Sequence, residues 1–295
     1  MDGARLAVLM TCFNRRDTTL RALRALALQK GLALIHIDVF LVDDGSTDGT
    51  ASAVAQEFPT VQVLHGDGSL FWNRGMHLAF ATALSANYDF YLWLNDDSIL
   101  YPDALHTLLN TSEQLSLLGC HDAIVGSAMQ DAVTQMHSYG GIRKHQTWWG
   151  RVWQTKVQPD DQPIQCDACN GNCVLIPRSV THKVGNLDPV FRHRWGDHDY
   201  CFRAIKAGCT VWLAPGYRGT CSRNPTHGTW EDLNLGFSQR IKKLTSYKAM
   251  HPKDYIVYLR RHRGPFWALH WLWPYCKITL QALRFTPQRK PKSVG

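Results

Sequence analysis

Short apolar runs that alternate with amphipathic segments constrain the fold of this chain more than any other feature of its sequence. The apolar runs are typical of buried strands and cover residues 6–12, 35–42, 60–64 and 90–94. The segments between them have helical periodicity and cover residues 18–29, 51–58 and 75–86. Strands separated by helices of this length predict right-handed βαβ units, and therefore an α/β fold with parallel strands in its sheet.

Three of the predicted strands end in polar clusters, at residues 11–14, 43–46 and 95–98. Ligands of such sheets bind in the crevice at the carboxyl ends of the strands. Two further polar clusters follow at residues 170–172 and 195–200, after an aromatic, glycine-containing stretch (123–157) that we expect to extend the sheet with strands and loops. The sequence therefore predicts one binding crevice built from several strand ends.

The composition indicates a globular protein in a reducing compartment. Of the 295 residues, 45% are hydrophobic and 19% charged, which excludes global disorder. Nine scattered cysteines, an odd number, favour free thiols and a cytoplasmic location. The first apolar run is too short for a secretory signal and has no cleavage signature, so we interpret it as a strand.

The positive charge is concentrated in the last part of the chain. From Arg240 onward there are thirteen Lys and Arg against one acid, which is a net charge of +12. The net charge of the whole chain is +8, so the residues before Arg240 carry a net charge of −4. Anionic partners are expected for the basic part, and both nucleic acid and a membrane surface qualify.

Adjacent acidic residues follow two of the buried strands. Asp96 and Asp97 repel each other unless a cation lies beside them, and Mg²⁺ or Mn²⁺ carrying a diphosphate suits such oxygen ligands. The alternative is that these acids cap a helix over residues 98–109. The pair Asp43 and Asp44 is equally open to a turn or cap interpretation, since Gly45 and Ser46 follow it.

Five motifs, in this order and spacing, resemble the family-two glycosyltransferases of the GT-A fold. The resemblance runs from Leu6 to about Pro225, and the motifs are Thr11–Arg15, Val42–Asp48, Gly66–Gly75, Asn95–Asp97 and Gly196–Arg203. It implies a Rossmann-type mixed sheet flanked by helices. It also implies a catalytic domain over residues 1–228, with a nucleotide-binding half (1–100) and an acceptor half (101–228), followed by a basic, Trp-rich helical extension over residues 229–295.

The resemblance implies transfer of a sugar, with inversion, from a nucleoside diphosphate such as a UDP- or dTDP-sugar. The residues that match the donor-binding positions are Thr11, Asn14, Asp43, Asp44, Gly68, Asn73, Arg74 and Asp96. Asp97 matches the ligand of Mg²⁺ or Mn²⁺. His227 falls where relatives carry a late histidine that completes the metal shell, although a solvated loop position explains it as well.

Asp197 matches the general base of the family, which deprotonates the acceptor hydroxyl. The alternative is that Asp197 is the N-cap of a helix over residues 200–207; the match through Arg203 and Gly208 favours the base. Two positions depart from the pattern: Gly196 replaces an acid that often precedes the base, and Asn95 replaces an acid in the triplet. The acceptor-side candidates are Asp167, Asn170, Trp195 and Asp199.

Two further segments are open to more than one interpretation. Cys166, Cys169 and Cys173 suggest zinc, but a structural site needs four ligands and no second pair is present. The aromatic run 266–275 is shorter than a membrane span. Together with Arg260, Arg261, Arg263 and Arg284 it favours a helix in the lipid headgroup region, and the alternatives are packing on the catalytic domain or a dimer contact.

The resemblance points further to bacterial enzymes of surface polysaccharide synthesis, including rhamnosyltransferases, which act on saccharide or lipid-linked acceptors at the cytoplasmic face of the membrane. A nucleotidyltransferase is an alternative, but it would need a glycine-rich loop after the first strand, and residues 11–16 contain no glycine. A nucleic-acid-binding protein is a second alternative. No known nucleic-acid-binding module occurs in the sequence, so we expect no nucleic-acid partner.

Overall fold

The computed structural model describes residues 3–148 and 152–284. The chain forms two compact units, one of residues 1–147 with 152–223 and one of residues 148–151 with 224–295. The division thus falls after Arg223, a few residues before the boundary predicted at residue 228. The last basic residues of the predicted extension, at positions 289, 290 and 292, lie outside the described residues.

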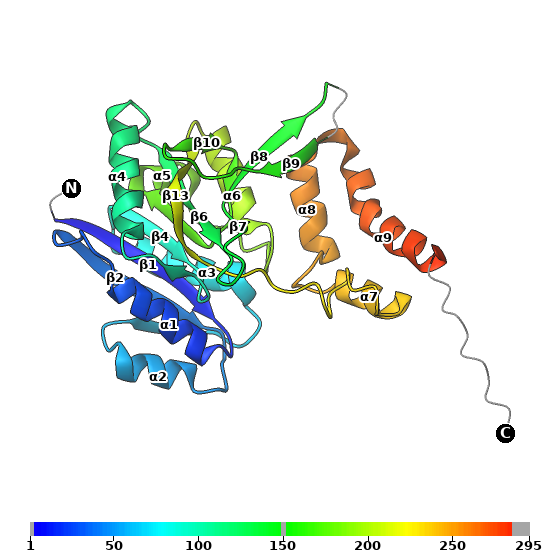
Figure 1. Cartoon of the computed structure of the whole chain (residues 1–295), viewed down its shortest axis with the longest axis horizontal. Helices are drawn as coiled ribbons and strands as arrows, with labels where there is room; N and C mark the ends of the chain where they lie inside the picture. Colours follow the sequence, from blue (N-terminus) through cyan, green and yellow to red (C-terminus); the bar gives the residue numbers. More distant parts are fainter. Residues whose placement is uncertain (1–2, 149–151, 285–295) are drawn as a thin grey trace. The chain divides into compact units, whose positions relative to one another are not determined.

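A mixed ten-stranded sheet forms the centre of the first unit, with the main strand order β10-β13-β6-β12-β4-β1-β2-β3 (Figure 1). Its strands are β1 (Ala4–Cys12), β2 (Ile35–Asp43), β3 (Gln62–His65), β4 (Phe90–Leu94), β5 (Ile99–Leu100), β6 (Ala123–Gln130), β7 (His137–Tyr139), β10 (Ile164–Cys166), β12 (Cys173–Pro177) and β13 (Thr210–Thr220). β1 is parallel to β2 and β4, whereas β12 is antiparallel to both β4 and β6. The predicted α/β fold with a mixed sheet is confirmed.

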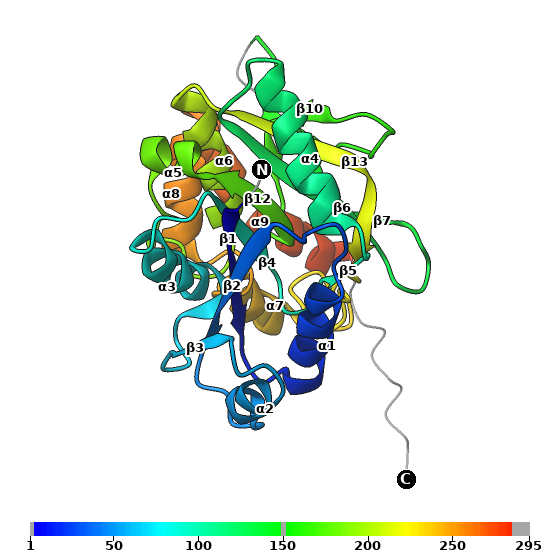
Figure 2. The same ribbon diagram turned by 90° about the vertical axis from the view of Figure 1, so that its left-hand side faces the viewer.

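Helices cover both faces of this sheet (Figure 2). They are α1 (Arg16–Ala27), α2 (Thr50–Glu57), α3 (Phe71–Leu84), α4 (Ala104–Leu117), α5 (Arg178–Val184) and α6 (Gly196–Lys206). Leu6, Val8 and Met10 alternate along β1 and share one core cluster with leucines of α1 and α4, so those two helices lie on the same face. α3 packs against β1 and β2 from the opposite face. The strand ends are therefore held rigidly from both sides.

A smaller sheet, with the order β11-β8-β9, adjoins the main one. It consists of β8 (Gly141–Gln146), β9 (Val152–Lys156) and β11 (Ala168–Cys169). Cys166 and Cys169 lie close together, with their Sγ atoms 3.7 Å apart. Cys166 belongs to β10 and Cys173 to β12, both in the main sheet, whereas Cys169 belongs to β11 of the smaller sheet. The three thiols are thus divided between the two sheets.

The second unit is helical, with α7 (Phe237–Leu244), α8 (Pro252–His262), a 3₁₀ turn (Gly264–Phe266) and α9 (Trp267–Arg284). Trp230, Leu244 and Ile278 form its small core. Pro274 interrupts the hydrogen bonding of α9, because it has no N–H for the carbonyl of His270, and Tyr255 of α8 donates its hydroxyl to that carbonyl at 3.4 Å. Among the described helices even α9, with 18 residues, lacks the hydropathy of a bilayer-spanning segment.

Candidate active site

The polar clusters after β1 and β2 are joined by hydrogen bonds. Asn14, in a left-handed conformation with φ of 51°, donates its backbone N–H to Ser46 Oγ (2.8 Å) and accepts the N–H of Thr47 on its side-chain oxygen (2.8 Å). Thr11 is buried against α3, where a Cβ added to Gly75 would lie 2.3 Å from Thr11 Oγ1. Asn14 therefore fixes the edge of the crevice, and Thr11 sets how closely α3 approaches β1.

Arg15 connects the first motif to the acidic pair that follows β4. Its Nη1 atom donates to Asp96 Oδ1 at 2.9 Å and to Asp97 Oδ2 at 2.8 Å. The sequence placed Arg15 inside a motif, but we assigned it no role. The sequence contains a signal for the contact between Arg15 and the acidic pair: a cation at the end of β1 faces two carboxylates at the end of the neighbouring strand β4.

Asp96 is buried, with 6% of its surface exposed. Burial raises the pKa of Asp96 to about 6; Arg15 opposes this rise, and the charge of Asp97 adds to it. Its second oxygen, Oδ2, is buried and has no hydrogen-bond partner among the described residues. A buried carboxylate oxygen without a partner is costly, so this atom is suited to a cation or a hydroxyl group brought by a ligand.

Asp97 is more exposed than Asp96 and contacts a buried thiol. Cys221, which follows β13, donates from Sγ to Asp97 Oδ1 at 3.4 Å and accepts from Asn172 Nδ2 at 3.2 Å. Burial, with the charge of Asp97, raises the pKa of Cys221 to about 12, so the thiol keeps its proton and remains a donor. No sequence pattern indicates a role for Cys221, because its contact with Asp97 depends on where β13 ends in space.

The residues after β4 fit a divalent cation that shares its coordination with a substrate. No group of three or more His, Cys, Asp or Glu side chains that could hold an ion occurs within residues 3–148 and 152–284. Mg²⁺ usually needs only one or two carboxylates, with phosphate oxygens and water as its other ligands. Asp97 and the unpartnered oxygen of Asp96 offer such a set. The alternative that both acids cap a helix is wrong, since β5 follows them and α4 begins only at Ala104.

His227 belongs to the second unit. Its side chain is 86% exposed, and its Nε2 atom lies 3.9 Å from Asp232 Oδ2. The structure therefore supports the solvated loop interpretation of this histidine, and its role as a metal ligand stays a prediction.

Asp44 organises the loop that precedes α3. Its carboxylate accepts the backbone N–H groups of Gly68 (2.9 Å), Leu70 (3.2 Å) and Phe71 (2.9 Å). α3 consequently begins at Phe71, four residues before the predicted start, because its first N–H groups are satisfied by a carboxylate from another loop. Gly68 takes φ of 86°, which favours glycine there.

Asp43 is also buried and accepts the N–H of Ser46 at 2.9 Å. Both acids thus serve as turn and capping groups, and their contacts with a nucleoside stay a prediction.

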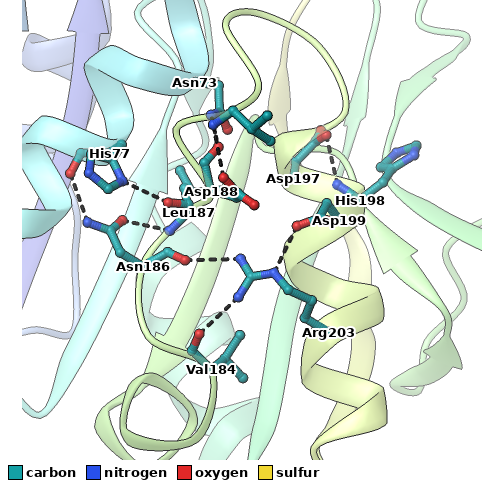
Figure 3. A network of polar contacts seen from close by, with 11 residues as sticks. Asn73, His77, Val184, Asn186, Leu187, Asp188, Asp197, His198, Asp199 and Arg203 are labelled. Carbon is teal, nitrogen blue, oxygen red and sulfur yellow. Dashed lines mark hydrogen bonds and ion pairs between the residues drawn. The ribbon is translucent and has the colours of Figure 1, made fainter. Parts of the chain in front are cut away.

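Asn73 and Arg74 hold the segment of residues 186–192, which we call the tether loop (Figure 3). Asn73 donates through Nδ2 to the carbonyls of Asp188 (2.8 Å) and Phe191 (2.9 Å), and Arg74 donates through Nε to that of Pro189 (2.8 Å). One turn later, His77 contacts the carbonyl of Leu187 through Nδ1 (2.7 Å). The two predicted donor-binding residues therefore link α3 to the loop that leads into α6.

Asp197 lies in the first turn of α6, which begins at Gly196. Its Oδ1 accepts the N–H of His198 at 2.8 Å, and its Oδ2 accepts that of Gly171 at 3.1 Å. The interpretation of Asp197 as the N-cap is wrong, because the N-cap is Trp195, in a left-handed conformation with φ of 81°. The helix was predicted to start at residue 200, so its first turn was not predicted. The reason is that the glycine and the acidic residues of that turn are also typical of a loop.

Asp199 is fully buried, and its carboxylate accepts from Arg203 Nε at 2.8 Å (Figure 3). The guanidinium of Arg203 also donates to the carbonyls of Val184 (2.9 Å) and Asn186 (3.0 Å). Asp199 therefore has no surface to offer an acceptor in this structure, in contrast to its predicted acceptor-side role. The ion pair instead ties α6 to the start of the tether loop.

Trp72 connects Asp197 to the acidic pair. Its indole N–H donates to Asn95 Oδ1 at 2.7 Å, and Asn95 immediately precedes Asp96. A Cβ added to Gly171 would lie 2.5 Å from the Trp72 ring and 3.5 Å from Asp197 Cβ. Gly171 thus lets the indole, the carboxylate of Asp197 and the loop after β4 meet, so the predicted base and the predicted metal site belong to one site.

The other acceptor-side candidates differ in position. Asn170 accepts the N–H of Gly140 (3.2 Å), and its Nδ2 lies 3.3 Å from His198 Nε2, so it borders the first turn of α6. Trp195 is half-buried, with the guanidinium of Arg194 5.2 Å from its ring centre. Asp167, in the bend between β10 and β11, accepts the N–H of Lys144 of β8 at 2.6 Å. Asn170 and Trp195 flank Asp197, whereas Asp167 serves the contact between strands.

We expect Gly196→Ala to lower the free energy of unfolding by about 1–3 kcal/mol, because a new Cβ meets a fixed side chain. That Cβ would lie 1.6 Å from Asn73 Oδ1, and Asn73 cannot move without losing its two bonds to the tether loop. Urea unfolding measures the change. The double variant Gly196→Ala, Asn73→Ala should be more stable than the sum of the two single losses predicts. Strictly additive losses would contradict the contact.

Comparisons with known proteins agree with this arrangement. The model of "Glycosyl transferase family 2" matches residues 7–185. An N-acetylglucosaminyl-diphospho-decaprenol L-rhamnosyltransferase of Mycobacterium tuberculosis is 24% identical over 257 residues, which are 80% of this chain and 79% of the relative. The same figures hold for two strains of that organism.

Two solved structures share the fold. The mannosyltransferase PcManGT from Pyrobaculum calidifontis, in complex with GDP-Man and Mn²⁺, is 16% identical with a TM-score of 0.54, over 94% of this chain and 73% of that one. TarS 1–349 of S. aureus is 12% identical with a TM-score of 0.55, over 95% and 79%.

The mixed sheet flanked by helices is that of the GT-A glycosyltransferases. The chain belongs to glycosyl transferase family 2. It is thus a glycosyltransferase, which decides against the nucleotidyltransferase alternative.

Proposed function

We propose that the enzyme transfers a hexosyl or rhamnosyl group, with inversion, from a UDP- or dTDP-sugar to a saccharide or lipid-linked saccharide acceptor. The observation that carries the proposal is the connection from Asp197 through Gly171 and Trp72 to Asn95. It holds a candidate base close to the two carboxylates of the donor side.

In this proposal Asp197 removes the proton of the acceptor hydroxyl while the hydroxyl attacks the anomeric carbon. The carboxylate already accepts two backbone N–H groups, which orient it. General base catalysis of this kind contributes roughly 10²–10⁴-fold. A single displacement inverts the anomeric centre and needs no carboxylate nucleophile.

Asp97, with the free oxygen of Asp96, would hold Mg²⁺ or Mn²⁺, which supplies Lewis acidity toward the departing diphosphate. In the enzyme without ligand, Arg15 contacts both carboxylates, and the buried thiol of Cys221 donates to Asp97. Asp44 fixes the loop of residues 66–71, and that loop would line the nucleotide.

A panel of UDP- and dTDP-sugars with Mn²⁺ tests the proposal. One donor should raise the melting temperature, because it binds only the folded state, and should be hydrolysed slowly in the absence of acceptor. The activity of the M. tuberculosis relative, an N-acetylglucosaminyl-diphospho-decaprenol L-rhamnosyltransferase, makes dTDP-rhamnose and a lipid-linked N-acetylglucosaminyl diphosphate the first donor and acceptor to try. A panel with neither a thermal shift nor hydrolysis would contradict the proposal.

We further propose that the second unit binds the cytoplasmic membrane surface, where a lipid-linked acceptor would lie. One face of α9 is apolar and exposed, with Leu269, Leu272, Trp273, Leu280 and Leu283 along it. Tyr275 and Ile278, on another face, pack in the core of the unit. Within the aromatic run 266–275, Trp273 is 62% exposed, whereas Trp267 and Trp271 are half-buried.

We expect the full chain to bind vesicles of anionic lipid, and the double variant Leu272→Ser, Trp273→Ser to bind roughly tenfold or more weakly, because it loses apolar burial. Vesicle sedimentation measures both. Salt should weaken but not abolish binding, since it screens only the basic residues. Leu117→Ser, Leu118→Ser, which changes two exposed leucines of α4, is the matched control. If the Leu117→Ser, Leu118→Ser control lost as much vesicle binding as the Leu272→Ser, Trp273→Ser variant, a specific role of α9 in membrane binding would be contradicted.

A further inference from the structure

The cation nearest to the predicted metal ligands belongs to the chain itself. A single nitrogen of Arg15 contacts one oxygen of Asp96 at 2.9 Å and one oxygen of Asp97 at 2.8 Å. Two carboxylates that share one cation are in the arrangement that a bound metal ion would otherwise require. The guanidinium therefore already supplies the neutralising charge in the enzyme without ligand.

A divalent cation cannot use the same oxygens while the guanidinium holds them. Nη1 lies 2.9 Å from Asp96 Oδ1 and 2.8 Å from Asp97 Oδ2, and two cations that contact the same oxygens repel each other strongly. Binding of the ion to these oxygens thus requires that Arg15 leave them. The oxygen Asp96 Oδ2 remains without a partner while Arg15 is in place, which shows that the guanidinium satisfies the pair only in part.

The structure has room for Arg15 in a second position. A hollow of about 370 Å³ lies at the start of α1, lined by Asn14, Arg15, Arg16, Asp17, Thr18 and Asp48. The side chain of Arg15 is 40% exposed, so its movement displaces no core residue. Asp17 and Asp48 would keep a displaced guanidinium close to negative charge.

We infer that Arg15 is an internal competitor of the divalent cation: it occupies the Asp96–Asp97 pair in the enzyme without ligand and lowers the affinity of the pair for metal. The inference rests on the proposed function, since it takes Asp97 as the metal ligand. Its consequence is that metal alone binds weakly. A diphosphate strengthens the binding, because its oxygens ligate the ion and its charge attracts the released guanidinium.

Mn²⁺ alone is the probe, and electron paramagnetic resonance of free Mn²⁺ measures its dissociation constant without turnover. We expect Arg15→Gln to bind Mn²⁺ at least about tenfold more tightly than the unaltered enzyme, because a competing charge is gone. Arg15→Lys keeps the charge and should bind as weakly as the unaltered enzyme. Arg16→Gln removes a neighbouring, half-exposed charge from the same hollow and is the matched control.

Equal or weaker Mn²⁺ binding by Arg15→Gln, or no binding by either protein, would overturn the inference. Arg15→Gln leaves two carboxylates unneutralised, so its melting temperature is recorded as well. A larger rise with Mn²⁺ than in the unaltered enzyme supports the inference by a second route. Asp97→Asn separates the two proposals. If Asp97→Asn leaves Mn²⁺ binding unchanged, Asp97 is not the metal ligand and the proposed metal site is wrong. If Asp97→Asn weakens Mn²⁺ binding but Arg15→Gln does not change it, the metal site stands and only the inference about Arg15 is contradicted.

Discussion

Asp197→Asn is expected to lower kcat by about 10²–10⁴-fold with little change in donor affinity, because the amide cannot take a proton. The substitution is close to isosteric. An amide offers one acceptor oxygen where the carboxylate offers two, so one of the bonds from His198 and Gly171 is also lost. That loss costs about 0.5–1.5 kcal/mol of stability, far too little to unfold the unit.

Steady-state transfer at saturating donor, together with donor affinity by calorimetry, checks this expectation. Asp131→Asn is the matched control, since Asp131 also accepts two backbone N–H groups, from Val133 and Thr134, in an exposed loop. If Asp197→Asn retained near-normal turnover, Asp197 would be a structural residue of the first turn of α6, and another base would have to be sought.

Asp97→Ala should abolish detectable transfer and remove the metal dependence of nucleotide binding, a loss of at least about 10²-fold in rate. Asp97 is the more exposed of the two acids, and Arg15 keeps its bond to Asp96 when Asp97 is gone. The fold should therefore survive, with a melting temperature close to that of the unaltered enzyme.

Calorimetric titration of UDP and dTDP, with and without Mn²⁺, measures the second effect. Asp103→Ala removes the carboxylate of an exposed ion pair with Arg218 and serves as the control for loss of one negative charge. Diphosphate affinity that responded to Mn²⁺ in Asp97→Ala as it does in the unaltered enzyme would show that another residue holds the ion.

The sequence predicted those parts of the fold that depend on local pattern. The strands that lead to Asn14 and Asp96, and the strand that ends at Asp43, lie within two or three residues of their predicted bounds, because a buried strand in a parallel sheet is a continuous apolar run. The starts of α3 and α6 were placed four residues late. In α3 the first N–H groups are satisfied by Asp44, more than twenty residues away, and no local capping signal announces such a start.

The same reason explains which residues of the candidate site were missed or misassigned. Arg15 and Cys221 owe their roles to contacts across neighbouring strands, and such contacts depend on register and strand ends. Asn73 was assigned to the donor by its motif, yet its side chain is buried in bonds to the tether loop. A motif identifies which residues matter, but a one-dimensional pattern does not show which way each side chain points.

The side chains of Asn73, Arg74, His77 and Arg203 hold this region through backbone carbonyls, those of Val184, just before the tether loop, and of Asn186, Leu187, Asp188, Pro189 and Phe191 within it; the Asn186 side chain also donates through Nδ2 to the carbonyl of His77 at 3.0 Å. Peptide oxygens are the same whatever side chain they accompany. A change of an exposed side chain of the loop, such as that of Pro189, therefore leaves these carbonyl contacts in place. Within this seven-residue loop, the exposed side chains can thus vary during evolution, while the backbone carbonyls keep the geometry that positions α6.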